Sequence, residues 1–127
     1  MQQISGLYVA PIGDKGRGVF TAVELKKGDT IEICQVIELL PEELPIIHKT
    51  TLHDYYFLWG EKHDRCVIVL GFGSLYNHSD HSNASFLMDL VNQTLDIFAV
   101  KDIEAGEEVT INYHGNPDDV GDLWFDQ

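Results

Sequence analysis

Short apolar runs separated by turn residues dominate the hydrophobic pattern of this chain. They cover residues 7–12, 19–22, 31–40 and 66–70, a longer stretch, 86–100, has turn residues at 91–94, and a last run, 107–113, alternates between polar and apolar residues. Runs of this length, rich in β-branched and aromatic residues, are typical of β-strands, and the longer stretch predicts a hairpin. Side chains alternate along the last run, so Val109, Ile111 and Tyr113 are expected on one face. The pattern predicts a mainly β fold.

One segment departs from this pattern. Pro41 and the two glutamates after it resemble the first turn of a short helix, with proline at an early position. Pro45 is expected to interrupt that helix. An aromatic-rich run, 53–59, follows, and such a cluster is more often part of a core than of a site.

The chain also contains an internal repeat, in which residues 20–31 resemble residues 98–109. In both copies a phenylalanine precedes a glycine by eight positions, and an acidic residue and then an apolar residue follow that glycine. Each copy predicts a strand, a short turn and a second strand. Two such units in one small chain predict a pseudo-symmetric all-β arrangement, although two unrelated β-turns would produce the same pattern.

Length and cysteine content indicate a single intracellular domain. A chain of 127 residues can form a core without disulfides. No apolar run approaches the roughly 20 residues of a membrane helix, and the first six residues lack the pattern of a signal peptide. Cys34 and Cys66 stand far apart, which disfavours a structural zinc site and indicates reduced thiols. We therefore expect a cytoplasmic protein without a membrane partner.

The chain is strongly acidic. Its net charge is −13, from 21 acidic and 8 basic residues. Binding to nucleic acid needs a basic face, so this charge argues against a nucleic-acid partner. The charge suits a basic protein partner, and it equally suits solubility alone.

The polar stretch from 71 to 85 is the most unusual part of the chain. It lies between the apolar run 66–70 and a second extended stretch that begins at Phe86. A plain turn needs only about two to five residues, so this stretch is either a solvated loop with Asx turns or a functional segment. The string Asn77-His78-Ser79, followed by Asn83, favours the functional interpretation.

That string resembles the asparagine-histidine-serine motif of SET-domain protein lysine methyltransferases. The usual form of the motif is Asn-His-Ser-Cys-x-Pro-Asn. Here Asp80 replaces the cysteine, Ser82 replaces the proline, and Ser74 replaces the arginine that often opens the motif. Three further features stand in the family's order: Gly16-x-Gly18, Asp54-Tyr55, and the ending Gly106 to Tyr113, in which Asn112 replaces the usual aspartate.

The resemblance covers about residues 7–115 and is greatest to the short SET proteins of viruses and bacteria. It implies a single SET domain over residues 1–127, with its core at about 7–115 and a C-terminal flank at 116–127. The implied β-clip-like fold has several small curved sheets and few helices. The Asn-His-Ser segment and the final strand would form a knot-like crossing near the C-terminus, so the buried polar loop needs many internal hydrogen bonds.

The resemblance also implies an activity: transfer of a methyl group from S-adenosyl-L-methionine to a lysine ε-amine, which leaves S-adenosyl-L-homocysteine. By the family match, Tyr113 is the central catalytic tyrosine. Tyr55, with Tyr56 as the alternative, would line the lysine channel. The cofactor-binding residues implied are the backbone of Gly16, Arg17 and Gly18 for the methionine part, Asn77 for the amino-acid end, the backbone of His78 for the adenine, and Trp124 stacked on the adenine.

Ile111 stands at a position that helps to set the number of methyl groups in this family. An isoleucine there cannot hold the water that a tyrosine would hold, so we expect di- or trimethylation. His78 and His81 are three residues apart, but no third ligand at a recognised spacing accompanies them, and no metal site is expected.

The expected partner is a basic protein that carries the target lysine, either histone-like or ribosomal. A histone substrate would place the protein in a nucleus, and the resemblance to short viral members implies a homodimer. The alternatives are a non-catalytic SET-like β-clip module that binds a peptide or small molecule, and a small structural β-protein that assembles with copies of itself. Retention of both Gly16-x-Gly18 and Tyr113 argues against a non-catalytic copy.

Overall fold

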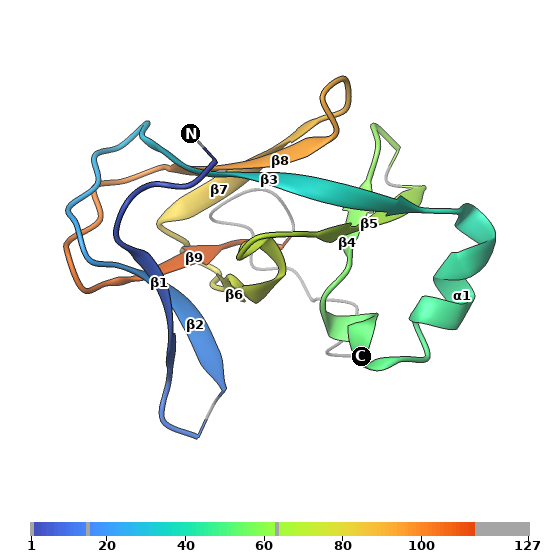
Figure 1. The fold of residues 1–127 in the computed structure, drawn as a ribbon, viewed down its shortest axis with the longest axis horizontal. Helices are drawn as coiled ribbons and strands as arrows, with labels where there is room; N and C mark the ends of the chain where they lie inside the picture. The colour runs from blue at the N-terminus through green and yellow to red at the C-terminus, as the bar shows by residue number, and fades with distance from the viewer. Residues whose placement is uncertain (1, 15, 63, 114–127) are drawn as a thin grey trace.

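Two β-sheets form the body of the protein (Figure 1). The computed structural model describes residues 2–14, 16–62 and 64–113. The four-stranded sheet has the order β1 (Leu7–Pro11), β2 (Arg17–Thr21), β9 (Glu108–Ile111), β6 (Asn77–His78). The five-stranded sheet has the order β4 (Phe57–Trp59), β5 (Arg65–Val69), β3 (Thr30–Leu39), β8 (Thr94–Ala99), β7 (Ala84–Asp89). The predicted mainly β fold is confirmed.

The long strand β3 is the central strand of the larger sheet. It pairs with β8 along its first half and with β5 along its second half, antiparallel to both, with a register shift after Thr30. The most deeply buried core side chains, all at 0% exposure, come from both sheets and from the loop segments between them: Val19, Ile31, Val67, Tyr76, Ala84, Leu95, Ile97, Ile103, Val109 and Ile111. One core therefore joins the two sheets and fixes their positions relative to each other.

The two copies of the internal repeat lie against each other as a pseudo-symmetric pair, as predicted. Leu25 and Ile103 exchange both backbone hydrogen bonds, at 2.8 and 2.9 Å. Outside this central pair, the Gly28 N–H donates to the Ala99 carbonyl at 2.8 Å, and the Gly106 N–H donates to the Thr21 carbonyl at 2.6 Å. When each residue of 20–31 is matched with its counterpart in 98–109, one of these two bonds corresponds to the other. The repeat in sequence is therefore a repeat in structure.

The polar stretch from 71 to 85 packs against the final strand. β6 pairs with β9 in parallel, with Asn77 opposite Thr110 and His78 opposite Ile111. Asn83 extends this pairing with its side chain, because its amide donates to the Glu108 carbonyl at 2.8 Å and accepts from the Thr110 N–H at 2.9 Å. The expected internal hydrogen bonding of this segment is confirmed, whereas the knot-like crossing stays a prediction.

Four short helical segments connect the strands: the 3₁₀ turns η1 (Pro41–Glu43), η2 (Thr51–Asp54) and η3 (Gly73–Leu75), and the helix α1 (Leu44–Ile47). The prediction that Pro45 interrupts the helix is wrong. Pro45 lies in the first turn of α1, where a missing N–H costs no hydrogen bond. In the part of the chain that the structure describes, no helix has the length and apolar character needed to cross a membrane.

The last strand is shorter than the predicted run of 107–113. Val109 and Ile111 are both fully buried on one face of β9, as the alternation predicted. Tyr113 follows two residues after the end of β9, so its side chain is not held by the sheet itself. Its position depends on contacts with other segments, and those contacts form the site.

Candidate active site

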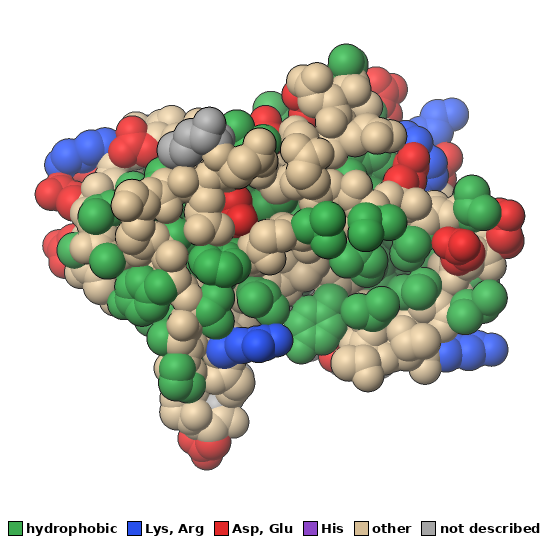
Figure 2. Space-filling model, in the orientation of Figure 1, with side chains coloured by type: hydrophobic (Ala, Val, Ile, Leu, Met, Phe, Trp, Pro, Cys, Tyr) green, Lys and Arg blue, Asp and Glu red, His purple; other side chains and the backbone are tan. Residues whose placement is uncertain are grey.

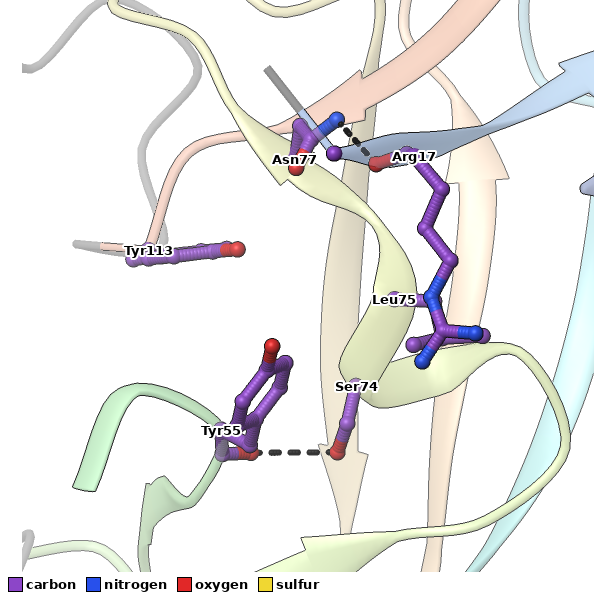
Figure 3. Close-up of a pocket in the computed structure, with 7 residues that line it drawn as sticks. Arg17, Tyr55, Ser74, Leu75, Asn77 and Tyr113 are labelled. Atoms are coloured by element: carbon purple, nitrogen blue, oxygen red, sulfur yellow. Dashed lines mark hydrogen bonds between the residues drawn. The ribbon is translucent and has the colours of Figure 1, made fainter. Parts of the chain in front are cut away.

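A cavity of about 400 Å³ opens where β2, β6 and the segments around Tyr55 and Tyr113 meet (Figure 3). Figure 3 shows the hydroxyl ends of Tyr55 and Tyr113 pointing into one space beside the η3–β6 segment. A second, much narrower cavity shares part of this wall. The residues common to both cavities are Tyr55, Ser74 and Tyr113.

Tyr113 is held by both its main chain and its side chain. Its N–H donates to Nδ1 of His78 at 3.1 Å, and its hydroxyl donates to the Tyr76 carbonyl at 2.6 Å. The ring lies edge-on to Phe57, with centroids 5.9 Å apart. Burial raises the pKa of Tyr113 to about 12, and nearby Tyr55 and the carboxylate of Asp54 add to the shift. The phenol therefore stays protonated at neutral pH.

The His78 side chain orients the end of the final strand. Its Nδ1 accepts from the Tyr113 N–H, so the ring proton belongs on Nε2, which lies 2.9 Å from Oδ1 of Asp80. A histidine bonded to both partners fixes the main chain of Tyr113 beside β6, just after the end of β9. The expected backbone contact of His78 with adenine stays a prediction, whereas its side chain has this structural role.

Asn77 connects two of the segments singled out in the sequence. Its amide nitrogen lies 2.9 Å from the Arg17 carbonyl and 2.8 Å from Oε2 of Glu108. Gly18 is buried beside this contact, and a Cβ there would lie 2.9 Å from the Asn77 amide nitrogen. Only glycine allows this approach, so the Gly-x-Gly segment and the Asn-His-Ser segment are packed directly together.

Tyr55 follows η2 and is 38% exposed. Oγ of Ser74 lies 3.0 Å from the Tyr55 carbonyl and 3.1 Å from the Val69 carbonyl. Ser74 therefore fixes the main chain from which the Tyr55 ring projects. The neighbouring Tyr56 is 6% exposed, and its hydroxyl pairs with Nδ1 of His48 at 3.1 Å.

The two cavities carry opposite charges at the ends that they do not share. Among the described residues that line the larger cavity, one has a charged side chain, Arg17, which extends beside η3 in Figure 3. The narrow cavity is lined in addition by Asp54, Tyr56 and Phe57, and of the residues that the structure describes only Asp54 brings a charge to this lining. Two molecules of different charge can therefore meet at the shared wall, an anionic group toward Arg17 and a cationic group toward Asp54.

The structure brings together five of the residues singled out in the sequence. Those that line the larger cavity are Gly16, Arg17, Asn77, Tyr55 and Tyr113. Gly18 and His78 support this wall without lining either cavity. Ile111 is fully buried in the core and also lines neither cavity, so its expected influence on product number stays a prediction. Trp124 lies outside the described residues.

Several residues of the site were not assigned a role from the sequence. Ser74 and Leu75 line the larger cavity, Tyr76 receives the Tyr113 hydroxyl, and Glu108 holds Asn77. Ser74 stands where the family motif usually has arginine, and that replacement was the available signal. The contact of Glu108 with Asn77 joins residues 31 positions apart, so no local pattern could have revealed it.

The chemistry of the larger cavity fits an amphipathic molecule with an anionic group. Gly16 leaves its side of the cavity open, since a Cβ there would meet nothing within 4 Å. The guanidinium of Arg17 offers donors to a carboxylate, and the amide of Asn77 offers a polar contact. Within residues 2–14, 16–62 and 64–113, no three His, Cys, Asp or Glu side chains gather closely enough to hold a metal ion.

Comparison with known proteins identifies the family. The SET domain model matches residues 16–114. A histone-lysine N-methyltransferase of Schizosaccharomyces pombe, specific for H3 lysine 37, is 32% identical over 123 residues, which cover 96% of this chain and 78% of the yeast protein. The crystal structure of a Plasmodium falciparum protein assigned as a histone methyltransferase superposes with a TM-score of 0.69 at 28% identity, over 98% of this chain and 99% of the other. The chain belongs to the SET-domain family of protein-lysine methyltransferases.

Proposed function

We propose that the protein transfers a methyl group from S-adenosyl-L-methionine to the ε-amine of a lysine in a basic protein segment. The cofactor would occupy the larger cavity, and the lysine would enter through the narrow one. The observation that carries this proposal is the shared wall, because Tyr55 and Tyr113 line both cavities and their hydroxyl ends point into one space (Figure 3). When bound, the cofactor supplies a methyl group on a positively charged sulfur.

The cofactor assignment rests on charge and shape. Arg17 would pair with the carboxylate of the cofactor, and Asn77 would contact its amino-acid end. The bonds of Asn77 to Glu108 and to the Arg17 carbonyl fix the amide in place before any ligand arrives. Such preorganisation lowers the entropy cost of binding.

The lysine must reach the site as a neutral amine, because an ammonium group has no lone pair to attack with. Free lysine has a pKa of about 10.4. Asp54, at the narrow cavity, would attract the ammonium form to the entrance. Desolvation inside the narrow cavity favours the neutral form, and the proton leaves to water.

Tyr113 would then align the amine. A tyrosine hydroxyl can donate and accept at the same time, so Tyr113 can accept an N–H of the amine while it donates to the Tyr76 carbonyl. This directs the nitrogen lone pair toward the larger cavity. Because burial keeps the phenol protonated, Tyr113 acts by orientation and not as a base.

A histone tail is the first substrate candidate, since the S. pombe relative is specific for a lysine of H3. The acidic character of the chain suits such a partner, and Figure 2 shows acidic side chains along the edges of one face, with Lys and Arg side chains scattered singly. We propose a nuclear site of action on this ground. The predicted homodimer stays a prediction.

Two measurements test the proposal together. Calorimetry should show binding of S-adenosyl-L-methionine, and mass spectrometry after incubation with histone H3 should show added methyl groups on lysine. The apparent KM for the histone should rise with salt, because exposed charges are screened over about 8 Å at physiological ionic strength. An absence of cofactor binding at millimolar concentration would refute the enzyme assignment.

A further inference from the structure

Glu32 is a buried carboxylate in the core of the protein. It lies on β3 and is 3% exposed. Burial of a charged group is costly unless hydrogen bonds compensate for the loss of water. Glu32 lines neither cavity and contacts neither tyrosine of the site directly. Its contacts therefore indicate what it does.

Three donors from separate segments converge on this carboxylate. The Gln3 side-chain amide and the Phe72 N–H donate to Oε2, at 3.0 and 3.1 Å. The Tyr76 hydroxyl donates to Oε1 at 2.8 Å. A Cβ at Gly71 would collide with Oε2, so the chain can wrap around the carboxylate only because residue 71 is glycine. Glu32 thereby anchors both ends of the 72–76 segment.

The anchored segment holds both tyrosines of the site. Ser74 fixes the Tyr55 carbonyl, as described above, and the Tyr76 carbonyl receives the Tyr113 hydroxyl at 2.6 Å. The Tyr76 ring is fully buried, with its hydroxyl on Glu32. The side chain of Tyr76 thus points into the core while its carbonyl points into the site.

We propose that Glu32 is a positioning residue for methyl transfer, because it fixes the 72–76 segment and, through it, the tyrosines at 55 and 113. This inference rests on the proposed function. Ser74 and Leu75 of this segment also line the larger cavity, but the polar contact of Asn77 is held separately, by its bonds to Glu108 and to the Arg17 carbonyl. Loss of the Glu32 anchor should therefore disturb alignment of the amine more than binding of the cofactor.

The variant Tyr76→Phe tests the inference. It removes the hydroxyl bond to Glu32 and keeps the buried ring, so the fold is expected to survive. We expect kcat to fall roughly ten- to a hundredfold, as small misplacements of reacting groups do. The Kd for S-adenosyl-L-methionine should stay within about twofold, and KM for the histone should change little. A glutamine at this position cannot accept from all three donors, so Glu32→Gln should also lower kcat.

Thr21→Val is the matched control. Thr21 is fully buried, and its hydroxyl donates to the Val23 carbonyl at 2.7 Å, at the opposite end of β2 from Arg17. The same hydroxyl accepts from the Val23 N–H at 3.2 Å, so this variant loses both hydrogen bonds of a buried hydroxyl, but kcat should stay at the native value.

The outcomes separate the two proposals. A Tyr76→Phe enzyme with kcat within about twofold of the native value overturns the positioning role. An equal loss of kcat in Thr21→Val also overturns it, because the effect would then reflect general destabilisation. A native protein that neither binds cofactor nor methylates histone refutes the proposed function, and the positioning role falls with it.

Discussion

The two copies of the internal repeat share a turn geometry but lead to different parts of the molecule. In each copy, a carboxylate accepts from the main chain three residues before it: Asp29 from the Lys26 N–H at 2.8 Å, and Glu107 from the Glu104 N–H at 3.1 Å. The first copy, 20–31, leads into β3 at the centre of the larger sheet. The second copy, 98–109, leads into β9 and ends at the site.

The difference arises from the neighbours of the outgoing strand. β3 extends over ten residues because β8 and then β5 supply partners along its whole length. β9 has only four residues, of which Glu108 and Val109 pair with β2, and Thr110 and Ile111 pair with the two-residue strand β6. After β9 ends, the Tyr113 N–H bonds to the His78 ring in place of a strand carbonyl. The same turn therefore leads into the centre of a sheet in the first copy, where strand pairing continues. In the second copy, where strand pairing ends, it leads into the candidate active site.

The largest effect should come from the residue that follows the second copy. Tyr113→Phe removes the hydroxyl that would orient the amine and keeps the ring against Phe57. We expect kcat to fall about a hundredfold, since the loss of one preorganised polar contact in other enzymes has an effect of this size. The Kd for the cofactor should be nearly unchanged, as measured by calorimetry.

Tyr8→Phe serves as the control for that variant. Tyr8 is 39% exposed on β1 and stacks on Phe20, with centroids 5.7 Å apart, and it lines neither cavity. Its loss of a hydroxyl should leave kcat unchanged. Near-normal turnover by Tyr113→Phe would contradict the proposed catalytic role of the Tyr113 hydroxyl.

An intermediate effect is expected at the two turn glycines, and it tests whether the copies are energetically equal. Gly28 and Gly106 have φ values of 95° and 91°, and a Cβ at either would meet nothing within 4 Å. Alanine at either position should therefore lower the free energy of unfolding by about 1–2 kcal/mol, through backbone strain alone. Urea denaturation measures both values, and a difference above about 0.5 kcal/mol would show that the turns are not equivalent.

The smallest effect is expected in the pH dependence of stability. The pKa of Tyr113 is raised in the folded protein, from 10.0 to about 12, so the fold favours the protonated phenol. Its contribution to the free energy of unfolding is complete below pH 10 and is lost as the pH rises toward 12. At pH 11 the loss is on the order of 1 kcal/mol. Urea denaturation from pH 8 to 11 should therefore show a steeper fall for the native protein than for Tyr113→Phe. Equal slopes would contradict the burial of this phenol.

Much of the architecture was determined by the sequence on its own. The alternation of apolar residues predicted the strands because side chains in a strand point to opposite faces. The Phe-to-Gly spacing predicted the repeat because a turn with positive φ needs glycine at a defined distance from its strand. The motifs also identified five residues that line the larger cavity, among them Tyr55, Asn77 and Tyr113.

Only the tertiary structure decided how those residues are held. Glu32 and Tyr76 are 44 positions apart, and the two tyrosines of the shared wall lie in separate segments joined through Ser74 and the Tyr76 carbonyl. The length of β9 likewise depended on the two-residue partner that the 71–85 stretch supplies. Local propensity acts over a few residues, whereas a hydrogen bond between distant segments exists only after the core has brought them together.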